Sequence, residues 1–106
     1  MNAVYKPVDV DVYLIEAEKG LAGKVYVAVA MGRVPSEQKP KLTFYIVPPL
    51  ELEKNVSKYK EIIKFVNADS EEFKSLRPEL RRLAREALRS PSAYVPQELV
   101  EELKKK

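Results

Sequence analysis

The chain has 106 residues, the size of one domain with a single modest core. Apolar residues make up 45% and charged residues 33%, a balance typical of a globular, soluble protein. The sequence has no cysteine, histidine or tryptophan, which excludes disulfides, thiolate nucleophiles, Cys/His zinc sites and Ser-His catalytic pairs. Its three glycines cannot form a P-loop or a GxGxxG fingerprint. An enzyme is therefore the least expected class, and no cofactor is expected.

The net charge of +3 permits an anionic partner without requiring one. No apolar run is long enough for a membrane span and no signal sequence opens the chain, so we expect a cytoplasmic protein without a membrane partner. Abundant Lys, Glu and Arg, few amide side chains, no cysteine and eight prolines are typical of a hyperthermophile.

The first half of the chain predicts strands. Side chains alternate between two sets along two segments, which are joined by a glycine-containing turn suited to a hairpin. A third alternating segment follows a proline-flanked polar loop and ends at Pro48. The predicted strands are residues 8–18, 25–34 and 41–47, the predicted loop is 35–40, and residues 50–54 form a short fourth strand or lead into a helix.

The second half predicts helices. One apolar stripe predicts a helix over 56–66 with Asn55 as its N-cap. Asp69 and Glu72 have capping-box spacing before a second helical stretch that ends near residue 88. Pro78 either lies in the first turn of that helix or kinks a continuous one, and Pro96 opens a final helix. Strands followed by helices indicate a single α+β domain over residues 1–106, with strands in 8–54 and helices in 55–104. We expect a three- to four-stranded antiparallel sheet with one face covered by the C-terminal helices.

Three tyrosines are the first candidate binding residues. Pairing Glu18 with Val25 places Val12 opposite Met31, so that the aliphatic faces of the two strands coincide. The reverse face then carries tyrosines among small residues, and uncovered rings can stack nucleic-acid bases. A structural role or a subunit interface remains the alternative, because tyrosine is also a good strand residue. These residues are Tyr13, Tyr26 and Tyr45.

An arginine-rich helix is the second candidate. Arg77, Arg81, Arg85 and Arg89 recur every four residues along one ridge, with Arg82 beside it. Residues 56–90 hold nine basic and six acidic side chains, which equals the net charge of the whole chain. Guanidinium groups match phosphate oxygens and also stack on bases. The alternative is a solvated helix face with Glu79 and Glu86 as local partners.

Asp9 and Asp11 are a weaker candidate, because two carboxylates on one strand face could hold a metal ion. Such a pair is more often solvated or protects a sheet edge from aggregation. A metal-dependent hydrolase that uses them would be the third class of function.

The layout of tyrosine-bearing strands followed by an Arg-rich helical half, in a small hyperthermophile-like chain, resembles the ThermoDBP-related proteins over roughly residues 8–90. The resemblance implies single-stranded-DNA binding in clefts formed by several subunits, without a cofactor. A coiled-coil dimer is not expected, because Leu99 and Leu103 supply barely one heptad. The sequence thus predicts a homo-oligomer that binds single-stranded DNA or RNA with little sequence preference. The alternative is an assembly module with no nucleic-acid ligand.

Overall fold

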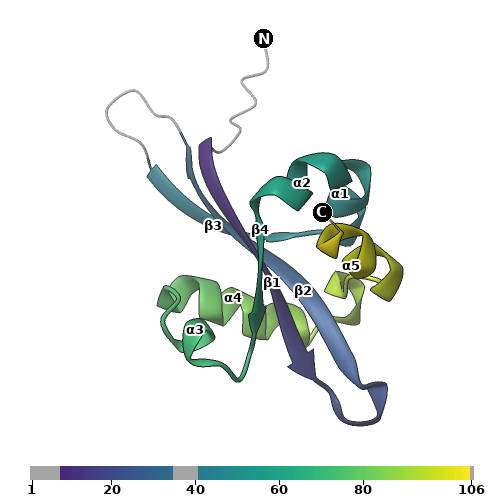
Figure 1. Ribbon diagram of the computed structural model, residues 1–106. Helices are drawn as coiled ribbons and strands as arrows, with labels where there is room; N and C mark the ends of the chain where they lie inside the picture. The colour runs from purple at the N-terminus through teal and green to yellow at the C-terminus, as the bar shows by residue number, and fades with distance from the viewer. Residues whose placement is uncertain (1–7, 35–40, 106) are drawn as a thin grey trace.

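The computed structural model describes residues 8–34 and 41–105, so the predicted loop 35–40 lies outside the described residues. Within this part of the chain, four strands form one open mixed sheet in the order β3-β2-β1-β4, and five helices pack against it (Figure 1). The strands are β1 (Val8–Glu18), β2 (Lys24–Val34), β3 (Lys41–Val47) and β4 (Ile63–Asn67). The helices are α1 (Pro49–Lys54), α2 (Val56–Ile62), α3 (Glu71–Lys74), α4 (Pro78–Leu88) and α5 (Gln97–Lys104). The predicted α+β class is confirmed.

The predicted hairpin joins β1 to β2, and its turn determines how the two strands pair. The turn contains a short 3-10 segment, Gly20–Ala22, and the Lys19 N–H donates to the Gly23 carbonyl at 2.8 Å. Gly23 has φ 77° and ψ −140°, a conformation that is essentially restricted to glycine. Closing the loop at Gly23 pairs Glu18 with Lys24 rather than with Val25. The predicted register is therefore wrong by one residue.

This shift redistributes the side chains between the two faces of the sheet. Val12 lies opposite Ala30 and Leu14 opposite Ala28, not opposite Met31 and Val29. Because side chains alternate, a slip of one residue moves every side chain of one strand to the other face relative to its partner. Val12 and Leu14 consequently share a face with Tyr26, not with the valines of β2.

The strand β4 was predicted as part of a helix. The helical stripe breaks at Ile63, whose φ of −78° and ψ of 137° are extended, and Ile63–Asn67 runs parallel to β1. β-Branched and aromatic residues favour a strand, and pairing satisfies backbone groups along an otherwise open edge of β1. The sheet is thus mixed rather than antiparallel throughout.

Helix starts also differ from the sequence prediction. Residues 49–54 form α1 with Pro49 in its first turn, so the strands of the first half end at Val47. The Asn55 side chain caps no helix N-terminus and instead donates to the Glu51 carbonyl oxygen at 3.1 Å. At α3 the N-cap is Ser70 rather than Asp69, because the Phe73 N–H donates to the Ser70 hydroxyl at 3.2 Å.

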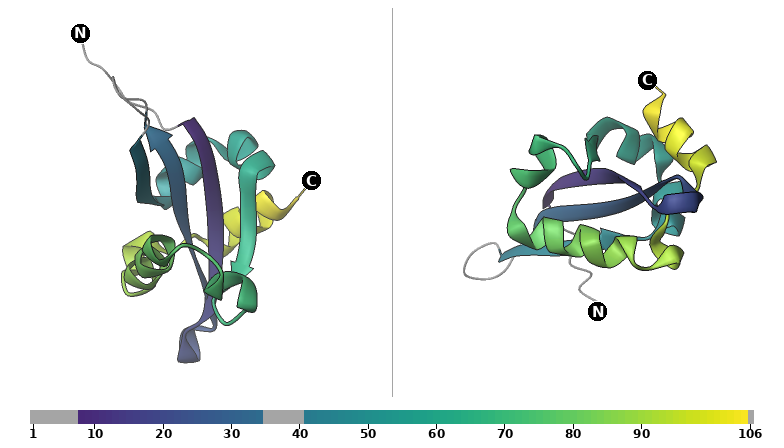
Figure 2. Two further views of the ribbon diagram at one scale, coloured as in Figure 1. Left: turned by 90° about the vertical axis from the view of Figure 1, so that its left-hand side faces the viewer. Right: turned by 90° about the horizontal axis from the view of Figure 1, so that it is seen from below.

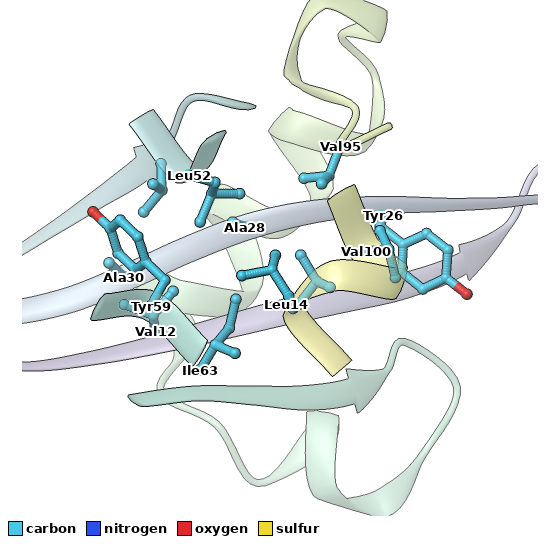
Figure 3. Packing of buried hydrophobic residues seen from close by; sticks show 12 residues of the cluster. Val12, Leu14, Tyr26, Ala28, Ala30, Leu52, Tyr59, Ile63, Val95 and Val100 are labelled. Atoms are coloured by element: carbon cyan, nitrogen blue, oxygen red, sulfur yellow. The ribbon is translucent and has the colours of Figure 1, made fainter. Parts of the chain in front are cut away.

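Both faces of the sheet are covered, whereas one covered face was predicted (Figure 2). We call the first the α5 face. It carries Val12, Leu14, Tyr26 and Ala28 and is covered by α1, α2 and α5 (Figure 3). The second, the α4 face, carries Ile15, Val25, Val27 and Val29 and is covered by α3 and α4. The arrangement follows from the apolar composition of both sides of β1 and β2, since each side requires its own layer of helices.

Among the described helices, none is long and apolar enough to cross a membrane.

Candidate functional site

The helix α4 displays the predicted arginines because its other side is buried. Leu80, Ala84, Ala87 and Leu88 lie in the apolar cluster of the α4 face. The remaining helix surface carries the arginines at the four-residue spacing of one ridge. Arg77 immediately precedes the helix and is exposed, as are Arg82, Arg85 and Arg89, while Arg81 is half-buried.

Two of these arginines lie against the segment that precedes α4. The Arg81 Nε donates to the Leu76 carbonyl oxygen at 3.1 Å. The Arg85 guanidinium carbon lies 6.0 Å from the centroid of the Phe73 ring, a cation–π distance. These contacts fix Arg81 and Arg85 on the side of α4 that faces α3. Each guanidinium has five N–H donors, so most of them are left for another acceptor.

The α4 arginines have no ion-pair partner within residues 8–34 and 41–105. The ion pairs described there join Lys24 to Glu16, Lys74 to Glu71 and Lys105 to Glu102. The local pairing with Glu79 and Glu86, which was the alternative to a binding surface, is therefore not observed among these residues. Five guanidinium groups, from Arg77 to Arg89, form a cationic surface in which none is ion-paired with a carboxylate of the described residues. We call this surface the arginine ridge.

The three candidate tyrosines do not share one open face. Tyr13 is half-buried on the α4 face, with the Lys64 Nζ 6.0 Å from its ring centroid. Tyr26 is only 5% exposed and belongs to the cluster of the α5 face (Figure 3). Tyr45 lies opposite Ala30 and packs, half-buried, against the same cluster. The predicted common surface is wrong, because the register places Tyr13 on the side opposite to Tyr26 and Tyr45.

The hydroxyl of Tyr59 contributes to the edge of the α5 face. It donates to the Glu51 Oε1 at 3.4 Å, a long hydrogen bond. Burial, followed by the charge of Glu51, raises the pKa of Tyr59 to about 12, and the same two causes raise the pKa of Tyr45. Both phenols are thus neutral at physiological pH, which suits packing better than proton transfer.

Phe65 is an exposed aromatic residue that the sequence analysis did not select. Its side chain is 40% exposed, and the Lys104 Nζ lies 5.8 Å from its ring and 5.6 Å from the ring of Tyr26. The sequence pattern assigned residue 65 to a helix, so Phe65 was not recognised as an exposed aromatic residue of a strand. The pattern that could have indicated this is the succession of aliphatic, cationic and aromatic residues in Ile63–Asn67, which fits an edge strand.

The two N-terminal aspartates lie where the ladder of β1 is irregular. Asp9 has φ 53°, and the pairing of β1 with β2 shifts between Val8 and Asp11. The strict alternation from which a shared face was predicted does not hold at this bulge. In the part of the chain that the structure describes, no group of three or more acidic side chains could hold a metal ion.

The geometry thus brings together the arginines and separates the tyrosines. Lys64 and Tyr13 are the additional cation and aromatic ring on the sheet face that α4 covers. The resemblance to the ThermoDBP-related proteins stays a prediction. Comparison of the chain with protein-family models, with curated proteins and with solved structures finds no match.

Proposed function

We propose that this protein binds single-stranded DNA or RNA in the cytoplasm with little sequence preference. The observation that supports the proposal is the arginine ridge, whose guanidinium groups have no carboxylate partner among the described residues. Arginine recognises phosphate oxygens with two parallel hydrogen bonds, so such a ridge suits a phosphate backbone. Glutamates at 79 and 86 reduce the positive charge of α4 without pairing with it.

Base stacking belongs to Tyr13 in this proposal. Its side chain is half-buried on the α4 face, and the Lys64 ammonium beside it adds a further phosphate contact. Tyr26 is too deeply buried to offer a ring surface to a base. One stacked base and several phosphate contacts give binding that tolerates any sequence, because every base has an aromatic face.

The test is fluorescence anisotropy with labelled oligo-dT at several salt concentrations. Arg82→Ala removes one exposed cation of the arginine ridge and should reduce the salt slope by about 0.7 for one phosphate contact on a single strand. The matched control is Lys58→Ala, which removes an exposed cation from α2 on the α5 face. Equal effects of the two variants, or no binding at low salt, would contradict the proposal.

Stacking is tested separately with Tyr13→Leu, which keeps an apolar side chain in the partly buried position. Binding should weaken by about 1–3 kcal/mol per stacked base. The salt slope should stay the same, because a phenol ring displaces no counterions. Duplex DNA of equal length should bind less well, since its bases are already stacked on one another. If the variant matches the wild type on both ligands, Tyr13 does not stack.

The second candidate function is an assembly module without a nucleic-acid ligand. It is favoured by β3, which lies at one edge of the described sheet and carries three half-buried apolar side chains on the α4 face. These are Leu42, Phe44 and Ile46. Sedimentation equilibrium at micromolar concentration tests it, and a mass of 12.1 kDa would exclude assembly.

A further inference from the structure

A groove lies between α5 and the junction of α1 with α2, on the side of the sheet opposite to α4. Its volume is about 480 Å³, and its lining is more apolar than polar. Val56, Pro96 and Leu99 provide the apolar part. Leu99 and Val56 are half-buried against the cluster of the α5 face, so the groove is continuous with the core beneath it.

The polar part of this groove is acidic. Glu53 comes from α1, and Glu98, Glu101 and Glu102 come from α5. The one cation in the lining, Lys105, pairs with Glu102 at 3.6 Å, which leaves a net charge of −3. Gln97 donates to the Glu101 Oε1 at 2.8 Å. The groove is therefore negative in a chain whose net charge is +3.

We propose that the groove receives the arginine ridge of a second copy of this chain. The charges are complementary, since one surface is a row of guanidinium groups that have no ion-pair partner in the described part of the chain, and the other is a row of carboxylates beside apolar side chains. The aliphatic stems of the arginines would cover Val56 and Leu99, while their guanidinium groups reach the rim. Such a contact combines apolar burial with hydrogen-bonded ion pairs.

The spacing of the charged residues also matches. Glu98, Glu101 and Glu102 occupy positions i, i+3 and i+4 of α5. In α4, read in the opposite direction, Arg85, Arg82 and Arg81 occupy the same three positions. Two helices packed antiparallel can therefore place one arginine opposite each glutamate, over about 6 Å of helix length. Antiparallel packing also aligns the helix dipoles favourably.

The contact would be heterologous, because each copy presents the groove on one face of the sheet and the arginine ridge on the other. Repeating such a contact builds a ring or an open chain of copies rather than a symmetric pair. Ion pairs at a partly exposed interface are screened by salt. The proposal therefore predicts self-association that weakens as the salt concentration rises, in the absence of any nucleic acid. It does not depend on the proposed nucleic-acid binding.

The experiment is sedimentation velocity on nucleic-acid-free protein at low and high salt, with two charge-reversal variants. The groove variant carries Glu98→Arg and Glu101→Arg, and the ridge variant carries Arg82→Glu and Arg85→Glu. Each reversal replaces two attractions with two repulsions, so each variant alone should associate about tenfold more weakly or not at all. The control is Glu61→Arg, an exposed residue of α2 outside the groove, which should associate like the wild type.

The decisive measurement is an equimolar mixture of the two variants. The groove variant keeps its native arginine ridge, which can enter the unchanged acidic groove of the ridge variant. The glutamates introduced into α4 of the ridge variant can in turn face the arginines introduced into the groove of the groove variant. Self-association should therefore return in the mixture, which a variant that had merely failed to fold could not produce. A wild type that stays at 12.1 kDa at every salt concentration would overturn the proposal. So would association that neither reversal weakens, or a mixture that stays monomeric.

Discussion

Leu80 projects from α4 into the cluster of the α4 face and is only 1% exposed. Replacing it with alanine removes buried methyl groups and leaves a cavity, which costs about 2–5 kcal/mol of unfolding free energy. The control is Leu50→Ala in α1. Because Leu50 is 59% exposed, this substitution should lower the unfolding free energy far less. Urea denaturation checks the pair through the unfolding midpoint, with the slope unchanged. Similar costs for the two variants would show that α4 does not pack on the sheet as described.

Tyr59 makes stability depend on alkaline pH. Its pKa is raised to about 12 from an ordinary value of 10.0, mainly by burial, because the folded protein disfavours the phenolate. A group whose pKa is higher in the folded state contributes stability that is complete below the unfolded pKa and is lost as the pH rises through the folded pKa. Unfolding free energy should therefore fall between about pH 10 and pH 12.

The variant Tyr59→Phe isolates this contribution, since it removes the titrating group and only a long hydrogen bond to Glu51. We expect a smaller alkaline loss of stability in the variant than in the wild type, measured by denaturation at pH 9, 10, 11 and 12, a series chosen to span that window. Tyr94→Phe serves as a comparison from the opposite face, because the Tyr94 hydroxyl donates to the Leu88 carbonyl. An identical pH profile for Tyr59→Phe and wild type would refute a raised pKa.

At the scale of elements, α3 tests which residue begins a short helix. Ser70→Ala removes the hydroxyl that accepts from the Phe73 N–H, and should cost about 0.5–2 kcal/mol. The neighbouring Asp69→Ala should be close to neutral, because the Asp69 backbone, not its side chain, makes the described hydrogen bond to Asn67. Thermal denaturation of both variants measures the two losses of stability. A larger loss for Asp69→Ala than for Ser70→Ala would show that Asp69 is the N-cap, as the sequence predicts.

The strand β4 shows why one element escaped prediction. Ile63 and Val66 are three residues apart, which matches a helical stripe, yet both also suit a strand. In the structure they point to opposite sides of the sheet, Ile63 into the cluster of the α5 face and Val66 into that of the α4 face. Lys64 and Phe65 are exposed between them, so the burial along this edge strand does not follow a period of two. Only pairing with β1, a contact between distant parts of the sequence, determines the outcome.

The same limit applies to the hairpin register and hence to the candidate site. Either alignment of β1 with β2 places apolar residues together, because both faces are covered by helices. The turn, closed by the Lys19–Gly23 hydrogen bond, selects the alignment that separates the tyrosines. The arginine ridge was predictable because its spacing within one helix is local. The tyrosine platform depended on the pairing of three strands, so one error in register removed it.

At the scale of the whole molecule, the two proposals use the same arginines, so nucleic acid and self-association should compete. A short oligo-dT that occupies one chain, about 4–16 nucleotides, should dissociate the wild-type assemblies at low salt. The groove variant, with Glu98→Arg and Glu101→Arg, keeps its arginine ridge free and should bind the oligonucleotide with an affinity independent of protein concentration. The apparent affinity of the wild type should fall as its concentration rises, because only the free fraction is competent to bind. Sedimentation velocity with labelled oligonucleotide measures both quantities. If the labelled oligonucleotide sediments with assemblies that keep their full size, nucleic acid and the groove contact different surfaces of the chain. The two proposals would then be independent of each other.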